Sequence, residues 1–244
     1  MISVVVHHTC ASSWKLFRGV KAKGLRVEFV PASFSHLRQM ALGIPAVFVD
    51  GELVLYDPVT VEDLEALASG SARRELSPDK AIENFITGVV YNQAFLSLAV
   101  LHGSFKPLLA DREVVEVLTR ARFHGDLKAA EAARAEIQRR DKELFAENRE
   151  LMLKSLAYGL TRELYWLGLR PSSLSAEHVS MWLLAKATVG RIGLQYPKPH
   201  VDRATAEAVA AILKERGEHY MAKIAEEQAA ISADSEFLSL FAER

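Results

Sequence analysis

The sequence is poor in cysteine, in long apolar runs and in net charge. A single cysteine among 244 residues excludes an internal disulfide and favours a reducing, cytoplasmic location. Asn92 and Gln93 interrupt the richest apolar stretch, Phe85 to Leu101, so we expect no transmembrane helix. A formal net charge of -1 gives no overall field that would attract nucleic acid or an anionic membrane. These absences predict a cytoplasmic protein with no nucleic-acid or membrane partner.

Length and composition set the expected architecture. A chain of 244 residues, 50% hydrophobic and 25% charged, is long enough to bury a sizeable core and to form two domains. The strand-like N-terminus lacks the basic region and cleavage site of a secretory signal, so we expect no signal peptide. Asn and Gln are scarce while Glu, Arg and Leu are abundant, a composition typical of a thermophilic source.

The first seventy residues alternate apolar runs with amphipathic segments and turn residues. Gly24 follows a helical pattern at the position where helices stop, and Asp50-Gly51 joins two apolar runs as a hairpin turn. A strand–helix–strand unit of this kind is most easily built parallel and right-handed. The predicted elements are strand 2–8, helix 12–23, strand 25–30, a short helix from Ser33 or Ser35 to about Leu42, strands 46–49 and 53–56, and helix 61–68. Their order is β-α-β-α-β-β-α.

The rest of the chain has helical patterns only. Residues 71–76 form a polar linker, and Ser77-Pro78-Asp79 is a good helix start, with a capping residue before a first-turn proline. We therefore predict two domains, residues 1–72 with the sheet and residues 77–244 with helices alone. The predicted helices are 78–102, 110–123, 126–167, 175–193 and 202–232.

Two short segments carry a resemblance to a known family. Thr9-Cys10-Ala11-Ser12-Ser13 is similar to the active-site loop of monothiol glutaredoxins, and Gly43-Ile44-Pro45 resembles the stretch that carries their cis-proline. The fold class expected from this likeness is α/β plus all-α, a thioredoxin-like N-terminal domain followed by a helical domain. The resemblance implies that Cys10 is the nucleophile and that Pro45 shapes the substrate groove beside Thr9. It also implies that the Ile44 backbone pairs with a bound peptide or thiol.

The chemistry of Cys10 follows from its place between a strand and a helix. Unpaired N–H groups at a helix start stabilise an anion, so we expect a lowered pKa and a thiolate near neutral pH. Ser13, one turn further, is expected to face the sulfur and to donate its hydroxyl proton to it. Since no second cysteine exists, Cys10 would form a mixed disulfide with a protein or small thiol, resolved by an external thiol. No bound cofactor and no metal are expected.

Three functions remain open at this point. The first is a monothiol thiol–disulfide oxidoreductase acting through Cys10. The second is a transferase-like enzyme that conjugates a thiol cofactor. It is suggested by the domain order, which also resembles that of the glutathione transferases, enzymes that carry Ser, Tyr or Cys at the position of Cys10. The third is a non-catalytic binding or assembly protein, in which the lone cysteine is a small buried apolar residue. His7 or His8 either stabilises the thiolate or simply ends the first strand.

Overall fold

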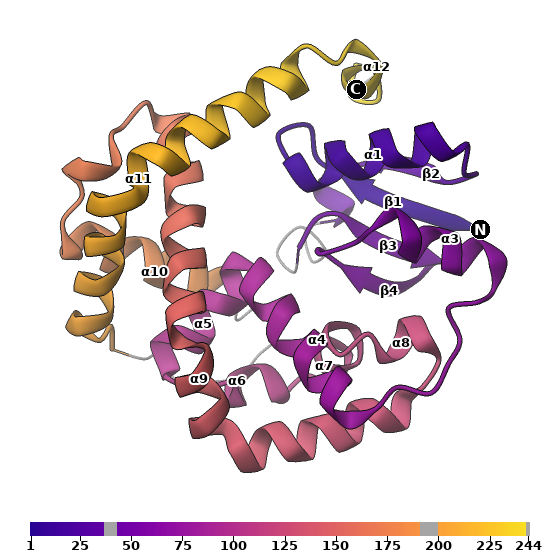
Figure 1. Cartoon of the computed structure of the whole chain (residues 1–244), viewed down its shortest axis with the longest axis horizontal. Helices are drawn as coiled ribbons and strands as arrows, with labels where there is room; N and C mark the ends of the chain where they lie inside the picture. Colours follow the sequence, from indigo (N-terminus) through magenta and orange to yellow (C-terminus); the bar gives the residue numbers. More distant parts are fainter. Residues whose placement is uncertain (37–42, 191–199, 243–244) are drawn as a thin grey trace. The chain divides into compact units, whose positions relative to one another are not determined.

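The computed structural model describes residues 1–36, 43–190 and 200–242 of a mixed α/β protein (Figure 1). A four-stranded sheet has the order β2-β1-β3-β4, with β1 parallel to β2 and β3 antiparallel to both β1 and β4. The strands are β1 (Ile2–Val6), β2 (Glu28–Pro31), β3 (Ala46–Val49) and β4 (Glu52–Tyr56). The described helices are α1 (Ala11–Lys23), η1 (Phe34–His36), α3 (Val61–Ser69), α4 (Pro78–Tyr91), α5 (Gln93–His102), α6 (Lys106–Leu109), α7 (Arg112–Leu118), α8 (Ala121–His124), α9 (Leu127–Leu167), η2 (Pro171–Ser173), α10 (Ala176–Gly190), α11 (Arg203–Ser232) and α12 (Ser235–Ser239).

The core beside the sheet follows from the apolar pattern of β1 and the two nearest helices. Val4 and Val6 are fully buried, as expected for a β-branched central strand. They pack with Leu16 of α1 and Leu64 of α3, which are also buried. Burying side chains of this size contributes about 1.5–3 kcal/mol each. This packing fixes the start of α1 relative to the end of β1.

The turns of this region confirm the sequence predictions. Gly24 ends α1 in the left-handed region at φ 65°, and its amide donates to the Lys21 and Val20 carbonyls. Asp50 and Gly51 have φ of 51° and 84°, and they join β3 to β4. Positive φ at both central residues matches the right-handed twist of a hairpin. The parallel pairing of β1 with β2 is also confirmed.

Several predicted boundaries were wrong for local reasons. Strand β1 ends at Val6 rather than residue 8, because residues 7–10 turn toward α1. The predicted helix 78–102 is divided into α4 and α5, since the Asn92 side chain accepts the amides of Ala94 and Phe95 and starts a new helix.

The predicted helix 110–123 is likewise divided into α7 and α8, at Arg120, which has a φ of 64°. The short helix expected as far as Leu42 lies, beyond η1, outside the described residues. Helices 126–167, 175–193 and 202–232 are confirmed as α9, α10 and α11, with residues 191–193 outside the described part.

The chain forms two compact units, each built from separate stretches of sequence. The first comprises Met1–Gly88, Arg112–Glu136 and Gln228–Arg244, and the second comprises Val89–Asp111 and Ile137–Glu227. The first unit contains the sheet. Its second stretch belongs to it because α7 and α8 pack against β4, and its third because the C-terminal segment packs against α1. The division into domains at residues 72–77 stays a prediction.

Beyond β4 the described chain contains helices and turns but no strand. Within these described residues, no single helix is long and apolar enough to cross a membrane. Helices α4 and α5 meet that length and composition only when taken together across the break at Asn92.

Candidate functional site

Cys10 lies at the beginning of α1, as the sequence predicts. It is the N-cap residue, with an extended backbone at φ -87°, and the residue as a whole is partly exposed. Its sulfur accepts the backbone N–H of Ser13 at 3.4 Å, and its own amide donates to the His7 carbonyl at 3.1 Å. A helix start directs positive potential toward this sulfur. The position therefore favours a negative charge on Cys10.

The Ile44-Pro45 segment meets Cys10 although 34 positions separate Ile44 from it in the chain. The Ile44-Pro45 peptide is cis and Pro45 is buried. The Cys10 thiol donates to the Ile44 carbonyl oxygen at 3.4 Å. This acceptor favours the protonated thiol, whereas the Ser13 amide favours the thiolate. Loss of the proton is therefore expected to end the hydrogen bond to Ile44 and to strengthen the contact with the Ser13 amide.

The two serines after Cys10 have different partners. Ser13 is fully buried, and its hydroxyl oxygen accepts the His7 amide at 3.3 Å. The contact to the sulfur that we expected from this hydroxyl is made by the Ser13 backbone amide. The Ser12 hydroxyl donates to a carboxylate oxygen of Asp57 at 3.1 Å. Ser13 thus supports the turn as well as the sulfur.

Asp57 also lines a pocket of about 190 Å³. Thr60, Lys80 and Arg120 are among its other polar residues. This pocket could not be predicted from the sequence, because its residues come from three separate stretches of the chain. It adds charged and hydroxyl groups to the side of the site occupied by Ser12.

His7 and Thr9 order the turn that leads into α1. Burial lowers the pKa of His7, and the neighbouring charge of His8 lowers it further. The Nδ1 atom of His7 accepts the Thr9 amide at 3.3 Å, so the Thr9 hydroxyl, 2.9 Å away, donates to the same atom. A neutral imidazole fits these contacts. His7 therefore shapes the turn and supplies no positive charge to Cys10 near neutral pH.

Histidine burial gives the fold a pH dependence. The pKa of His124 is also lowered, chiefly by burial, although its Nδ1 lies 2.8 Å from the Ala72 carbonyl oxygen, which acts in the opposite direction. Below about pH 6.5 the unfolded chain takes up protons that these folded histidines resist, so stability falls as the pH is lowered. We expect the melting temperature to fall between about pH 7.5 and 5.5. His124→Asn keeps a donor near Ala72 and should reduce this fall, and an unchanged fall would contradict the assignment.

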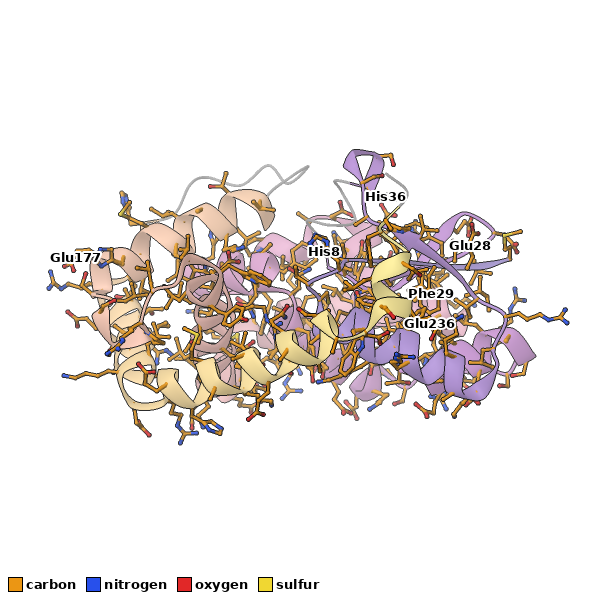
Figure 2. All side chains as sticks on the ribbon, turned by 90° about the horizontal axis from the view of Figure 1, so that it is seen from above. His8, Glu28, Phe29, His36, Glu177 and Glu236 are labelled. Atoms are coloured by element: carbon orange, nitrogen blue, oxygen red, sulfur yellow. The ribbon has the colours of Figure 1, made fainter. Side chains whose placement is uncertain are left out.

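The C-terminal segment contacts the same turn, which the sequence did not predict. The Gln228 side-chain amide donates to the Thr9 carbonyl oxygen at 3.0 Å. Trp14 Nε1 donates to Asp234 at 2.7 Å, and Arg18 forms an ion pair with the same carboxylate. Figure 2 shows α12, with Glu236 labelled, near Phe29 of the sheet. One role of Asp234 has a local cause: aspartate is a favoured N-cap residue, and the Asp234 side chain caps α12 by accepting the Phe237 amide.

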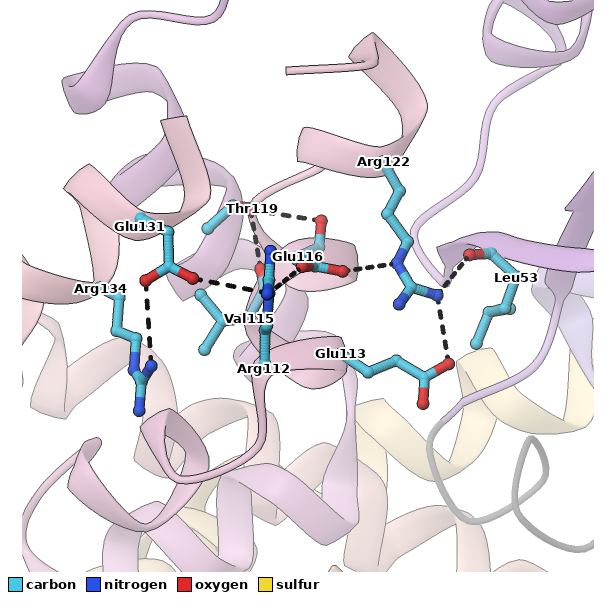
Figure 3. Close-up of polar contacts among 9 residues, drawn as sticks. All are labelled: Leu53, Arg112, Glu113, Val115, Glu116, Thr119, Arg122, Glu131 and Arg134. Carbon is cyan, nitrogen blue, oxygen red and sulfur yellow. Dashed lines mark hydrogen bonds and ion pairs between the residues drawn. The ribbon is translucent and has the colours of Figure 1, made fainter. Parts of the chain in front are cut away.

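A cluster of alternating charges lies beside β4, the last strand of the sheet (Figure 3). Glu116 is nearly buried between Arg112 Nε at 2.6 Å and Arg122 Nε at 2.9 Å. Arg122 also pairs with Glu113 and donates to the Leu53 carbonyl oxygen at 3.3 Å. Burial lowers the pKa of Arg122, but the two carboxylates outweigh this and raise it.

These contacts cover part of an exposed strand edge, which is a structural use of charge. An adjoining pocket of about 630 Å³ is lined by Leu53, Glu113, Glu116 and Arg122 among others. Its lining includes none of the predicted site residues. Because the charges of the cluster neutralise one another, we assign it a role in joining α7 and α8 to β4.

The residues expected at the site therefore meet in space. Cys10, Ser13, Thr9 and Ile44 are joined by direct contacts or a shared turn, and Pro45 follows Ile44. Within residues 1–36, 43–190 and 200–242, no group of three or more His, Cys, Asp or Glu side chains is placed to hold a metal ion. The chain matches no protein-family model, no curated protein and no solved structure.

Proposed function

We propose that residues 1–72 form a thioredoxin-like domain and that Cys10 is the nucleophile of a monothiol thiol–disulfide oxidoreductase. The element order and the strand order β2-β1-β3-β4 support the fold assignment. The parallel pair β1–β2 beside the antiparallel strands β3 and β4 is also consistent with it. A fold of this kind hosts many functions, so the functional proposal depends on the site itself.

The observation that carries the functional proposal is the environment of one sulfur atom. Cys10 Sγ lies at a helix start, 3.4 Å from the Ser13 amide nitrogen and 3.4 Å from the Ile44 carbonyl oxygen. The helix start and the amide stabilise a thiolate, which is the reactive form of cysteine. Cys10 is a partly exposed residue, which is consistent with access by a partner. A buried structural cysteine needs neither feature.

The proposed reaction is two successive exchanges. The Cys10 thiolate attacks one sulfur of a substrate disulfide, forming a Cys10–substrate mixed disulfide and releasing the other sulfur as a thiolate. An external thiol, as its thiolate, then attacks the substrate sulfur of the mixed disulfide. This step regenerates the Cys10 thiolate and leaves the substrate joined to the external thiol. The external thiol is required because the chain has one cysteine.

Alkylation of Cys10 by iodoacetamide as a function of pH tests the proposal. We expect the rate to follow a titration with an apparent pKa below the value of about 8.5 for an ordinary thiol. The thiolate is favoured by the Ser13 amide and the helix start, and the Ile44 carbonyl limits the size of the decrease. Intact-mass analysis after incubation with cystamine should show one mixed disulfide that dithiothreitol removes.

The alternatives predict different results in the same experiments. An apparent pKa at or above about 8.5, with no cystamine adduct, would favour the non-catalytic binding protein. Protection of Cys10 by reduced glutathione, without formation of a mixed disulfide, would favour the transferase-like enzyme. Only a lowered pKa together with a reversible adduct supports exchange.

A further inference from the structure

We propose that residues 228–242, here called the C-terminal strap, form a wall of the Cys10 site that admits small disulfides and excludes folded proteins. This inference rests on the proposed function and names its class of substrate. The strap consists of the last turn of α11, the turn at Asp234, and α12 with the residues that follow it. Figures 1 and 2 both show α12 beside α1.

The residues on both sides of Cys10 contact the strap. Before Cys10, the Thr9 carbonyl oxygen accepts a hydrogen bond of 3.0 Å from Gln228, which is only 4% exposed. After Cys10, Ala11 is buried in a cluster with Ile231 and Phe237 of the strap. The Ile44 carbonyl occupies another side of the sulfur. The strap therefore contacts both chain neighbours of Cys10 while Ile44 contacts its sulfur, and we expect these contacts to restrict the approach of a large partner.

A buried charge holds the strap on α1. The Asp234 side chain is 3% exposed and receives hydrogen bonds from Trp14 Nε1 and from the Phe237 amide, besides its ion pair with Arg18. Burial raises the pKa of Asp234, but these donors outweigh it and lower the pKa, so the carboxylate is ionised at neutral pH. A buried carboxylate with this many donors is costly to separate from its partners.

Aromatic packing makes the wall continuous with α1 and the sheet. The centroids of the Phe237 and Phe17 rings lie 5.3 Å apart, and those of the Phe17 ring and the Phe29 ring of β2 lie 5.2 Å apart. Phe241 contacts His8 edge-on at 5.6 Å. Phe17 and Phe237 are both essentially fully buried. The strap is therefore integral to the packing around the start of α1, and it is expected to stay in place when a partner approaches.

The test compares two reagents with the same chemistry and different size. One is hydroxyethyl pyridyl disulfide, and the other is the same pyridyl disulfide attached to a small folded carrier protein that has no cysteine. Attack by Cys10 releases pyridine-2-thione in both cases, and its absorbance gives the rate. The quantity compared is the ratio of the rate with the small reagent to the rate with the carrier. We expect this ratio to be at least tenfold larger for the wild-type protein than for a free thiol, a difference of about 1.4 kcal/mol in barrier.

Two acid-to-amide substitutions on the strap separate its attachment from general effects of charge. Asp234→Asn removes the charge that holds the strap yet keeps a side chain able to cap α12. Glu236→Gln is the matched control, since the ion pairs of Glu236 with Arg18 and Lys21 are exposed. We expect Asp234→Asn to raise the carrier reaction severalfold and leave the small-reagent reaction within about twofold, and Glu236→Gln to change neither. Gln228→Ala provides a second variant if Asp234→Asn fails to fold.

The result separates this inference from the proposed function. If wild-type Cys10 reacts with the carrier as readily as a free thiol does, or if Asp234→Asn and Gln228→Ala leave the size ratio unchanged, the strap is not a wall and the inference is overturned. The pH profile of iodoacetamide alkylation is read independently. A lowered thiol pKa with no size discrimination would retain the oxidoreductase and reject the wall, whereas size discrimination at an ordinary thiol pKa would retain the wall and reject the oxidoreductase.

Discussion

Replacing Cys10 by serine is expected to reduce thiol–disulfide exchange to the uncatalysed rate. A serine hydroxyl at this position keeps nearly the same shape and the contact with the Ser13 amide, but it forms no useful anion near neutral pH. The mixed disulfide cannot form, so neither exchange step can occur. The measurement is the rate at which cystamine is reduced by dithiothreitol with and without the protein, together with the mass of the adduct.

Stability controls are needed to assign this loss to chemistry. The Cys10→Ser protein should unfold at nearly the same urea concentration as the wild type, because one sulfur is exchanged for oxygen in a partly exposed residue. Ser69→Ala, an exposed change near the end of α3, should leave both exchange and stability unaltered. Exchange that survives in Cys10→Ser would show that the reaction does not pass through this residue.

The elements around the site were largely predictable because each has a local cause. Gly24 ends α1, and Asp50-Gly51 joins β3 to β4, since these turns require positive φ and the sequence supplies residues that tolerate it. Thr60 caps α3 through a reciprocal contact with Asp63. The meeting of Cys10 with Ile44 was predicted from family resemblance, because no local rule connects residues so far apart.

Contacts between distant parts of the chain were missed for the same reason. Gln228 and Asp234 lie in a polar, Ala- and Glu-rich helix and the turn after it, and nothing local indicates that they return to Thr9 and Trp14. Arg120 was placed inside a predicted helix, where its left-handed backbone could not be foreseen. Side chains of this kind receive their roles from tertiary packing, which periodicity does not report.

The largest expected loss of stability comes from one such contact, the pair of Arg120 and Asp63. Arg120 donates to both carboxylate oxygens of Asp63, at 3.0 and 2.6 Å, and to the Pro58 carbonyl oxygen at 3.1 Å. The Asp63 carboxylate also accepts the Thr60 amide at 2.9 Å at the start of α3. One ion pair therefore joins the α7–α8 junction to the segment between β4 and α3. Two-point pairs of Arg with carboxylate are among the strongest polar contacts in proteins.

Asp63→Asn should lower the free energy of unfolding by about 3 kcal/mol, the lower end of the cost of breaking a buried pair, because Arg120 stays partly buried without its counter-charge. Urea unfolding followed by circular dichroism measures this loss. Glu62→Gln is the matched control, since the adjacent Glu62 is exposed and its ion pair is with the exposed Lys23, so its change should have a much smaller effect.

Arg120→Met, which removes the other partner, should be less damaging in the Asp63→Asn background than alone, because the unpaired cation is then absent. Arg120 already has a positive φ, so methionine adds no new backbone cost at this position. Additive losses in the double variant would show that the two side chains act independently. In that case the junction between α7 and α8 would be held on the sheet by apolar packing, such as that of Phe123 with the core, instead of by this ion pair.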